Sequence, residues 1–131
     1  METFDVDVRA AARRLAERRR RRREAVEERL ARARAAAARI IDHIATTYQP
    51  RSIHVWGSLV RTERFSAISD IDIAIDGFPG GETELSRVRD YADHLTDIPL
   101  DLVVLERLDP GRVELITRFG RRVWPEDSDA G

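Results

Sequence analysis

Three aspartates and a Gly-Ser pair are the residues of this sequence whose types and spacing could do chemistry. Gly57 and Ser58 follow a short apolar segment, and eleven residues separate Ser58 from Asp70. In a strand, alternate side chains share a face, so Asp70 and Asp72 would point the same way. Asp101 lies within a later apolar run, where a carboxylate is costly to bury unless it is paired or metal-bound. Placed on neighbouring strands, these carboxylates could bind one or two hard divalent cations, which prefer oxygen ligands.

The Gly-Ser pair supplies what a phosphate needs. A glycine at a strand end lets the backbone approach a phosphate closely, because it carries no side chain. A helix starting at Ser58 would direct free N–H groups and a hydroxyl at that phosphate. Arg61, one turn further, could reach the same phosphate as a forked donor.

Each of these features has an ordinary alternative. Gly-Ser pairs are common in turns, two alternating aspartates can be the solvated face of a strand, and Asp101 could belong to a loop. Their occurrence together, in this order and at strand ends, favours a site for a metal and a nucleotide.

The combination resembles the DNA polymerase beta-type nucleotidyltransferase superfamily, and in particular its minimal nucleotidyltransferase (MNT) group. The residues that carry the resemblance are Gly57, Ser58, Arg61, Ser69, Asp70, Ile71, Asp72 and Asp101. It covers about residues 50–125, including the closing segment RFGRRVW. The resemblance implies that Asp70, Asp72 and Asp101 are catalytic ligands of Mg²⁺. It also implies that Gly57, Ser58 and Arg61 bind the phosphates of ATP.

The resemblance also implies a protein partner. MNT proteins are typically paired with HEPN-domain proteins in toxin–antitoxin modules, and some transfer AMP to a tyrosine of that partner. The chain is therefore expected to be an antitoxin that adenylylates a HEPN toxin. Two departures from the pattern, eleven residues before Asp70 where ten are common and Thr62 where a glycine is common, leave a binding-only antitoxin open. Transfer to a small molecule or to a nucleic acid are further alternatives, the latter supported by the arginine run alone.

Composition bounds the class of protein. A chain of 131 residues with 42% hydrophobic and 36% charged residues is expected to form one modest core. It has no cysteine, so disulfides and thiolate metal sites are excluded. No run of eighteen apolar residues occurs, and the N-terminus lacks the apolar segment of a signal peptide. We expect a soluble, cytoplasmic protein without a membrane span.

Residues 1–49 are predicted to form a long helical segment that serves interaction or homo-oligomerisation. Between residues 6 and 48 there is no glycine or proline, and strong helix formers dominate. Either one helix or two that meet near Arg18–Arg23 fit this composition. An apolar stripe comprises Val26, Leu30, Ala33, Ala37, Ile40 and Ile44, and must pack on something. The six arginines either lie on a solvated helix or contact nucleic acid or an acidic partner.

After residue 50 the pattern predicts an α/β (α+β) nucleotidyltransferase-like core, residues 50–125, with a small mixed sheet and flanking helices. Strands are expected at 52–56, 71–75 and 100–105, with an edge strand at 122–124. Helices are expected from Ser58 and at 82–95 and 110–119. Residues 126–131 are expected to be a disordered tail.

Overall fold

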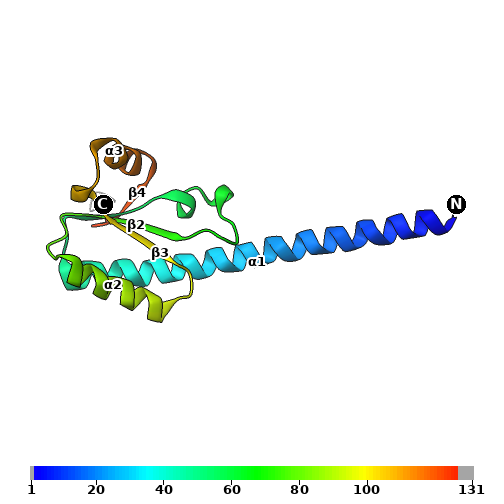
Figure 1. Cartoon of the computed structure of the whole chain (residues 1–131), viewed down its shortest axis with the longest axis horizontal. Coiled ribbons are helices and arrows are strands. Elements are labelled where there is room, and N and C mark those ends of the chain that lie inside the picture. Colours follow the sequence, from blue (N-terminus) through cyan, green and yellow to red (C-terminus); the bar gives the residue numbers. More distant parts are fainter. Residues whose placement is uncertain (1, 127–131) are drawn as a thin grey trace.

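A computed structural model describes residues 2–126, with side chains from residue 7 onward. Its first element is one continuous helix, α1 (Glu2–Tyr48), 47 residues long. The helix ends where Gln49 adopts a positive φ of 49° before Pro50. Of the two arrangements that the sequence allowed, the single helix is the observed one. Figure 1 shows its N-terminal half extending away from the rest of the molecule.

The remaining chain is built around a four-stranded mixed sheet. Its strands are β1 (Ser52–Val55), β2 (Ile71–Asp76), β3 (Leu100–Val104) and β4 (Arg121–Trp124). They lie in the order β3-β2-β1-β4. β2 and β3 are parallel, while β1 is antiparallel to both β2 and β4. The mixed sheet and the edge position of β4 confirm the predicted fold class.

Helices cover both faces of the sheet. α1 and α2 (Glu82–Leu95) lie against one face, and α3 (Pro110–Phe119) lies on the other (Figure 1). The larger core fills the space between α1, α2 and the sheet, and the fully buried residues Ile40, Ile73 and Val88 belong to it. A smaller cluster, formed by Ala74, Leu105 and Ile116, lies under α3. Side chains recur on the same face about every 3.6 residues in a helix and every two residues in a strand, and this spacing directs these apolar side chains into the two clusters.

The expected helix from Ser58 is wrong. The described residues between β1 and β2 form two 3₁₀ turns instead, Gly57–Leu59 and Thr62–Arg64. β1 and β2 are adjacent and antiparallel, so their connection need not cross the sheet as a helix would. Phe65, only 6% exposed, draws the connection back to the core.

The predicted tail at residues 126–131 falls mostly on residues 127–131, which lie outside the described residues. The proposed division into segments 1–49 and 50–125 stays a prediction, since the C-terminal half of α1 also contributes to the core. No helix in the described part of the chain is long and apolar enough to cross a membrane.

Candidate active site

The sheet register brings two of the three aspartates together. In the parallel ladder between β2 and β3, Asp72 is the direct partner of Asp101. Asp70 lies two residues before Asp72, immediately ahead of β2. Parallel strands are about 4.8 Å apart, so the two paired carboxylates start from neighbouring backbone positions on one face. The structure therefore places the predicted acids at the same end of the sheet.

This end of the sheet face is left open. Asp72 and Ala74 share a face of β2, and their partners Asp101 and Val103 share the same face of β3. α3 packs over the Ala74 and Val103 end through Ile116. Beyond that cover, Asp72 is half-buried and Asp101 is exposed. The carboxylates thus lie at the border between a packed layer and solvent.

Burial and neighbouring negative charge act together on Asp72. Desolvation, the charge of Asp101 and the charge of Asp70, in that order of size, together raise the pKa of Asp72 from 3.8 to about 7. Both causes disfavour a charged carboxylate. The arrangement concentrates like charges that an added cation would neutralise.

Gly57 holds the turn against this carboxylate. Its φ of +71° is a left-handed conformation that side-chain-bearing residues rarely adopt. A Cβ at Gly57 would also overlap the Asp72 carboxylate. The backbone is tied at the same point, because the Trp56 N–H donates to the Asp72 carbonyl oxygen over 3.2 Å. The Gly57 carbonyl in turn accepts hydrogen bonds from the N–H groups of Val60 and Arg61.

A basic hollow of about 440 Å³ opens next to Gly57. It is lined by Trp56, Gly57, Arg61, Arg64, Arg112, Leu115, Ile116 and Phe119. The Arg61 guanidinium carbon lies 5.4 Å from the centre of the Phe119 ring, a cation–π distance. Of the predicted phosphate-binding residues, Gly57 and Arg61 line the hollow, whereas Ser58 does not.

The sequence interpretation missed Arg64, Arg112 and Phe119 as residues of this hollow. Arg112 and Phe119 come from α3, which is distant in sequence from the Gly-Ser turn. The available signal was their spacing of seven with Leu115 and Ile116 between them, which puts all four on one side of a helix. That spacing does not say where the helix packs.

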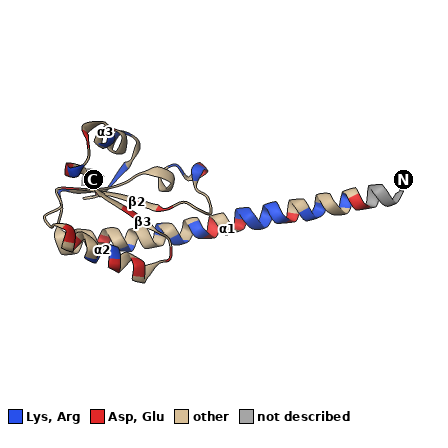
Figure 2. Ribbon diagram, in the orientation of Figure 1, with Lys and Arg blue, Asp and Glu red and all other residues tan. Residues whose placement is uncertain are grey.

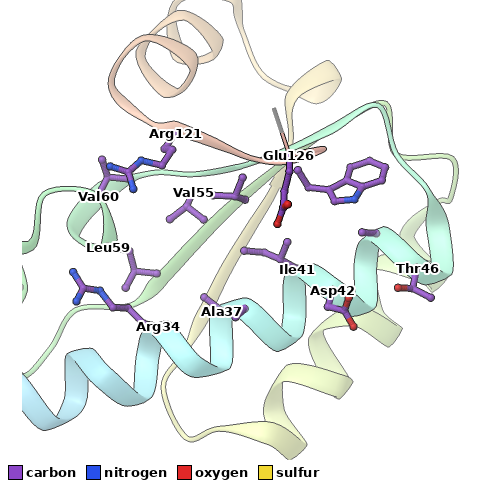
Figure 3. A pocket seen from close by; sticks show the side chains of 14 residues that line it. Arg34, Ala37, Ile41, Asp42, Thr46, Val55, Leu59, Val60, Arg121 and Glu126 are labelled. Carbon is purple, nitrogen blue, oxygen red and sulfur yellow. The ribbon is translucent and has the colours of Figure 1, made fainter. Parts of the chain in front are cut away.

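A larger hollow, about 800 Å³, lies on the opposite face of the sheet between α1 and the β1–β4 edge. Ala37, Ile41, Val55 and Leu59 are among its lining residues (Figure 3). Its lining is mainly apolar and includes none of the three aspartates. The three aspartates do not line the smaller hollow either, but Gly57, which lies against the Asp72 carboxylate, is part of its lining.

The donor set fits a hard divalent cation, although the side chains as placed do not yet enclose one. Among the described residues, no three acidic or histidine side chains converge closely enough to hold a metal ion. Aspartate oxygens are the ligands that Mg²⁺ prefers, and the crowded charge around Asp72 would be relieved by a cation. Rotation of short side chains on Asp70, Asp72 and Asp101 is the change that ligation would need.

Comparisons with known proteins add evidence on the fold. No protein-family model and no curated protein matches the sequence. The chain resembles a chain in the crystal structure of a toxin–antitoxin MntA–HpeT mutant, with a TM-score of 0.53 and 17% identity. The similarity covers 70% of this chain and 72% of the other. At this level of identity the similarity shows a shared fold.

A second solved structure, a proposed nucleotidyltransferase from Sulfolobus solfataricus, matches with a TM-score of 0.48 and 23% identity. That match covers 76% of this chain and 86% of the other chain.

Proposed function

We propose that this chain is a Mg²⁺-dependent nucleotidyltransferase that transfers AMP from ATP to a HEPN-type toxin partner, and so acts as an antitoxin. The observation that supports this best is the pairing of Asp72 with Asp101 on an open sheet face, directly beside the Gly57 turn. An acidic pair and a phosphate-approachable glycine next to a basic hollow suit a nucleotide triphosphate.

In this proposal the residues divide into two groups. Asp70, Asp72 and Asp101 would hold Mg²⁺, which when bound supplies neutralisation of the triphosphate and activation of an attacking oxygen. Gly57 would let the backbone approach the phosphates, and the Ser58 hydroxyl would donate to them. Arg61 would complete the phosphate contacts from the wall of the basic hollow.

A hydroxyl oxygen of the acceptor attacks the α-phosphorus, the bond from that phosphorus to the β-phosphate bridging oxygen breaks, and pyrophosphate leaves. The hydroxyl proton would pass to a carboxylate at the site, and the exposed Asp101 would accept it in this proposal. Positioning and charge stabilisation supply most of the catalysis in such phosphoryl chemistry.

The acceptor is proposed to be a protein because the fold resembles a chain of a toxin–antitoxin pair. The mutant in that structure replaces two aspartates, two positions apart, by glutamate. Asp70 and Asp72 have the same spacing in this chain. An antitoxin that acts by binding alone is the second candidate, favoured by the eleven residues that separate Ser58 from Asp70, where ten are common in the MNT group.

The test incubates the chain with ATP, MgCl₂ and the HEPN-type protein encoded beside it, and measures the intact mass of that protein. We expect a gain of one or more AMP groups, lost with Asp101→Asn. Asp76→Asn is the matched control: Asp76 shares the Asp72 face of β2 but lies at the other strand end, paired with Arg51 at 3.0 Å. Neutralisation of the toxin with no change in its mass would support the binding-only antitoxin. A neighbouring gene that encodes no HEPN protein would overturn the proposed partner.

A further inference from the structure

The N-terminal half of α1 is a helix without a packing partner in this chain. Between residues 7 and 25 every side chain is exposed except those of Ala10 and Glu17, which are partly covered. The first fully buried position of the helix is Ala33. At about 1.5 Å per residue, the projecting part extends about 35 Å beyond the globular part. The segment contributes no residue to the candidate active site.

The segment carries a dense and unbalanced charge. Residues 7–25 contain nine arginines and three acidic residues. The run Arg18–Arg23 covers more than one and a half turns, so arginines surround the helix on all sides, as the blue band in Figure 2 shows. Glu17 pairs with Arg20 and Arg21, and Glu24 lies 3.9 Å from Arg20. In the described part of the chain, no ion pair involves Arg18, Arg19, Arg22 or Arg23.

A second copy of this helix cannot be the partner along this segment. Val8 and Leu15 are exposed hydrophobic residues seven positions apart, the start of a heptad stripe. The next position of that stripe is Arg22, and the intervening positions at 18 and 19 are also arginines. Two copies paired in this way would bury like charges against each other.

The shape of the charge distribution favours one kind of polyanion. A flat acidic protein surface meets a helix from one side and would leave the opposite arginines unused. The major groove of B-form DNA is about 12 Å wide and admits a helix of about 10–12 Å diameter. Phosphates then flank the helix on two sides while base edges, rich in acceptors, face it on a third. The major groove of an RNA duplex is too deep and narrow for a helix.

We propose that the N-terminal half of α1 binds in the major groove of duplex DNA through Arg18–Arg23. This binding is independent of the nucleotidyl-transfer site, since the segment lies outside the globular part that holds Asp72 and Asp101. The basic regions of dimeric DNA-binding proteins, which enter the major groove as continuous helices, provide the physical precedent. Most of the affinity is electrostatic and comes from the release of counterions by the arginines.

The salt dependence gives a quantitative expectation. Each neutralised phosphate contributes about −0.9 to the slope of log K against log salt concentration. If about six arginines each contact a phosphate, the affinity falls roughly a thousandfold between about 50 and 200 mM salt.

The experiment titrates the full-length chain into a fluorescently labelled DNA duplex of about 20 base pairs, two helical turns. Anisotropy is measured at several salt concentrations. The test variant is Arg19→Gln, Arg22→Gln and Arg23→Gln combined, because glutamine keeps helix propensity while removing charge. The matched control removes three exposed arginines elsewhere, Arg39→Gln, Arg87→Gln and Arg107→Gln combined. An RNA duplex of the same sequence is titrated alongside.

We expect the test variant to bind DNA at least about tenfold more weakly, with a salt slope shallower by about 2–3. The control variant should stay within about twofold of the wild type, and the RNA duplex should bind more weakly than DNA. Equal affinity of the two triple variants would overturn the proposal. So would equal binding of DNA and RNA, or a loss of affinity for the protein partner with DNA binding unchanged.

Discussion

The two faces of the central sheet are built from the same strands and serve opposite purposes. Along β2, Ile71, Ile73 and Ile75 are fully buried against α1 and α2. The alternate residues, Asp72 and Ala74, face α3 and the open end of the sheet. Along β2, one face is therefore closed by packing, while the other is left partly unpacked and charged. Because successive side chains of a strand point to opposite faces, β2 stabilises the fold with one set of residues. With the other set it holds carboxylates, at a cost to stability.

The largest expected effect lies on the closed face. Ile73→Ala removes a side chain that is 0% exposed and should lower the free energy of unfolding by about 2–5 kcal/mol. Urea denaturation followed by circular dichroism measures it. Ile68→Ala, the same chemical change at a residue 88% exposed, is the control and should shift stability by less than about 0.5 kcal/mol. Similar losses in both variants would contradict the difference between the faces.

Gly57→Ala acts on the open face with the next largest effect. A left-handed alanine costs about 1–2 kcal/mol, and its Cβ would also push the Asp72 carboxylate out of place. We expect reduced thermal stability together with a loss of ATP binding. Gly111→Ala in the first turn of α3 is the control, and its φ lies outside the left-handed region. Unchanged ATP binding by Gly57→Ala would show that the turn does not hold the phosphates.

The raised pKa of Asp72 should make the free energy of unfolding depend on pH. Its pKa of about 7 in the folded chain exceeds the ordinary value of 3.8, so the folded state retains a proton that the unfolded state has lost. The free energy of unfolding therefore falls as pH rises from about 4 to about 7, and levels off above that. Asp72→Asn has no such proton.

In chelator-treated protein, Asp72→Asn should gain stability relative to the wild type across that same pH window. Melting temperatures of both proteins, measured in parallel at several pH values, check this. A difference that stays constant with pH would mean that Asp72 is not held in a desolvated, negatively charged surrounding.

The smallest expected effect concerns the basic hollow. Arg112→Ala removes an exposed guanidinium from its wall and should weaken ATP binding about two- to fivefold, in the range of an exposed ion pair. Arg87→Ala on α2, across the sheet from the hollow, is the charge-matched control and should leave binding unchanged. Equal weakening of ATP binding by both variants would mean that net charge, and not the hollow, determines the effect.

The two faces of the sheet also show which features could be predicted from the sequence and which could not. Alternation along β2 was sufficient to predict that Asp70 and Asp72 share a face, because strand periodicity is local. That Asp101 lies beside them was implied by the family resemblance, and the register of β2 and β3 pairs it with Asp72. The 3₁₀ turns after Gly57 and the placement of Arg112 in the hollow depend on long-range packing of Phe65 and α3. Neither the turns nor the position of Arg112 produces a hydrophobic periodicity in the surrounding sequence.

The central claim is that the aspartates and the Gly57 turn form one metal and nucleotide site. Isothermal calorimetry of ATP with MgCl₂ tests it most directly, on the wild type, on Asp70→Asn combined with Asp72→Asn, and on Asp76→Asn. The double variant should stay folded, because removing crowded like charges relieves repulsion. We expect it to bind Mg²⁺–ATP more than about 100-fold more weakly, beyond the loss typical of an outer-shell partner, while Asp76→Asn binds normally. Equal binding by the wild type and the folded double variant would contradict the account.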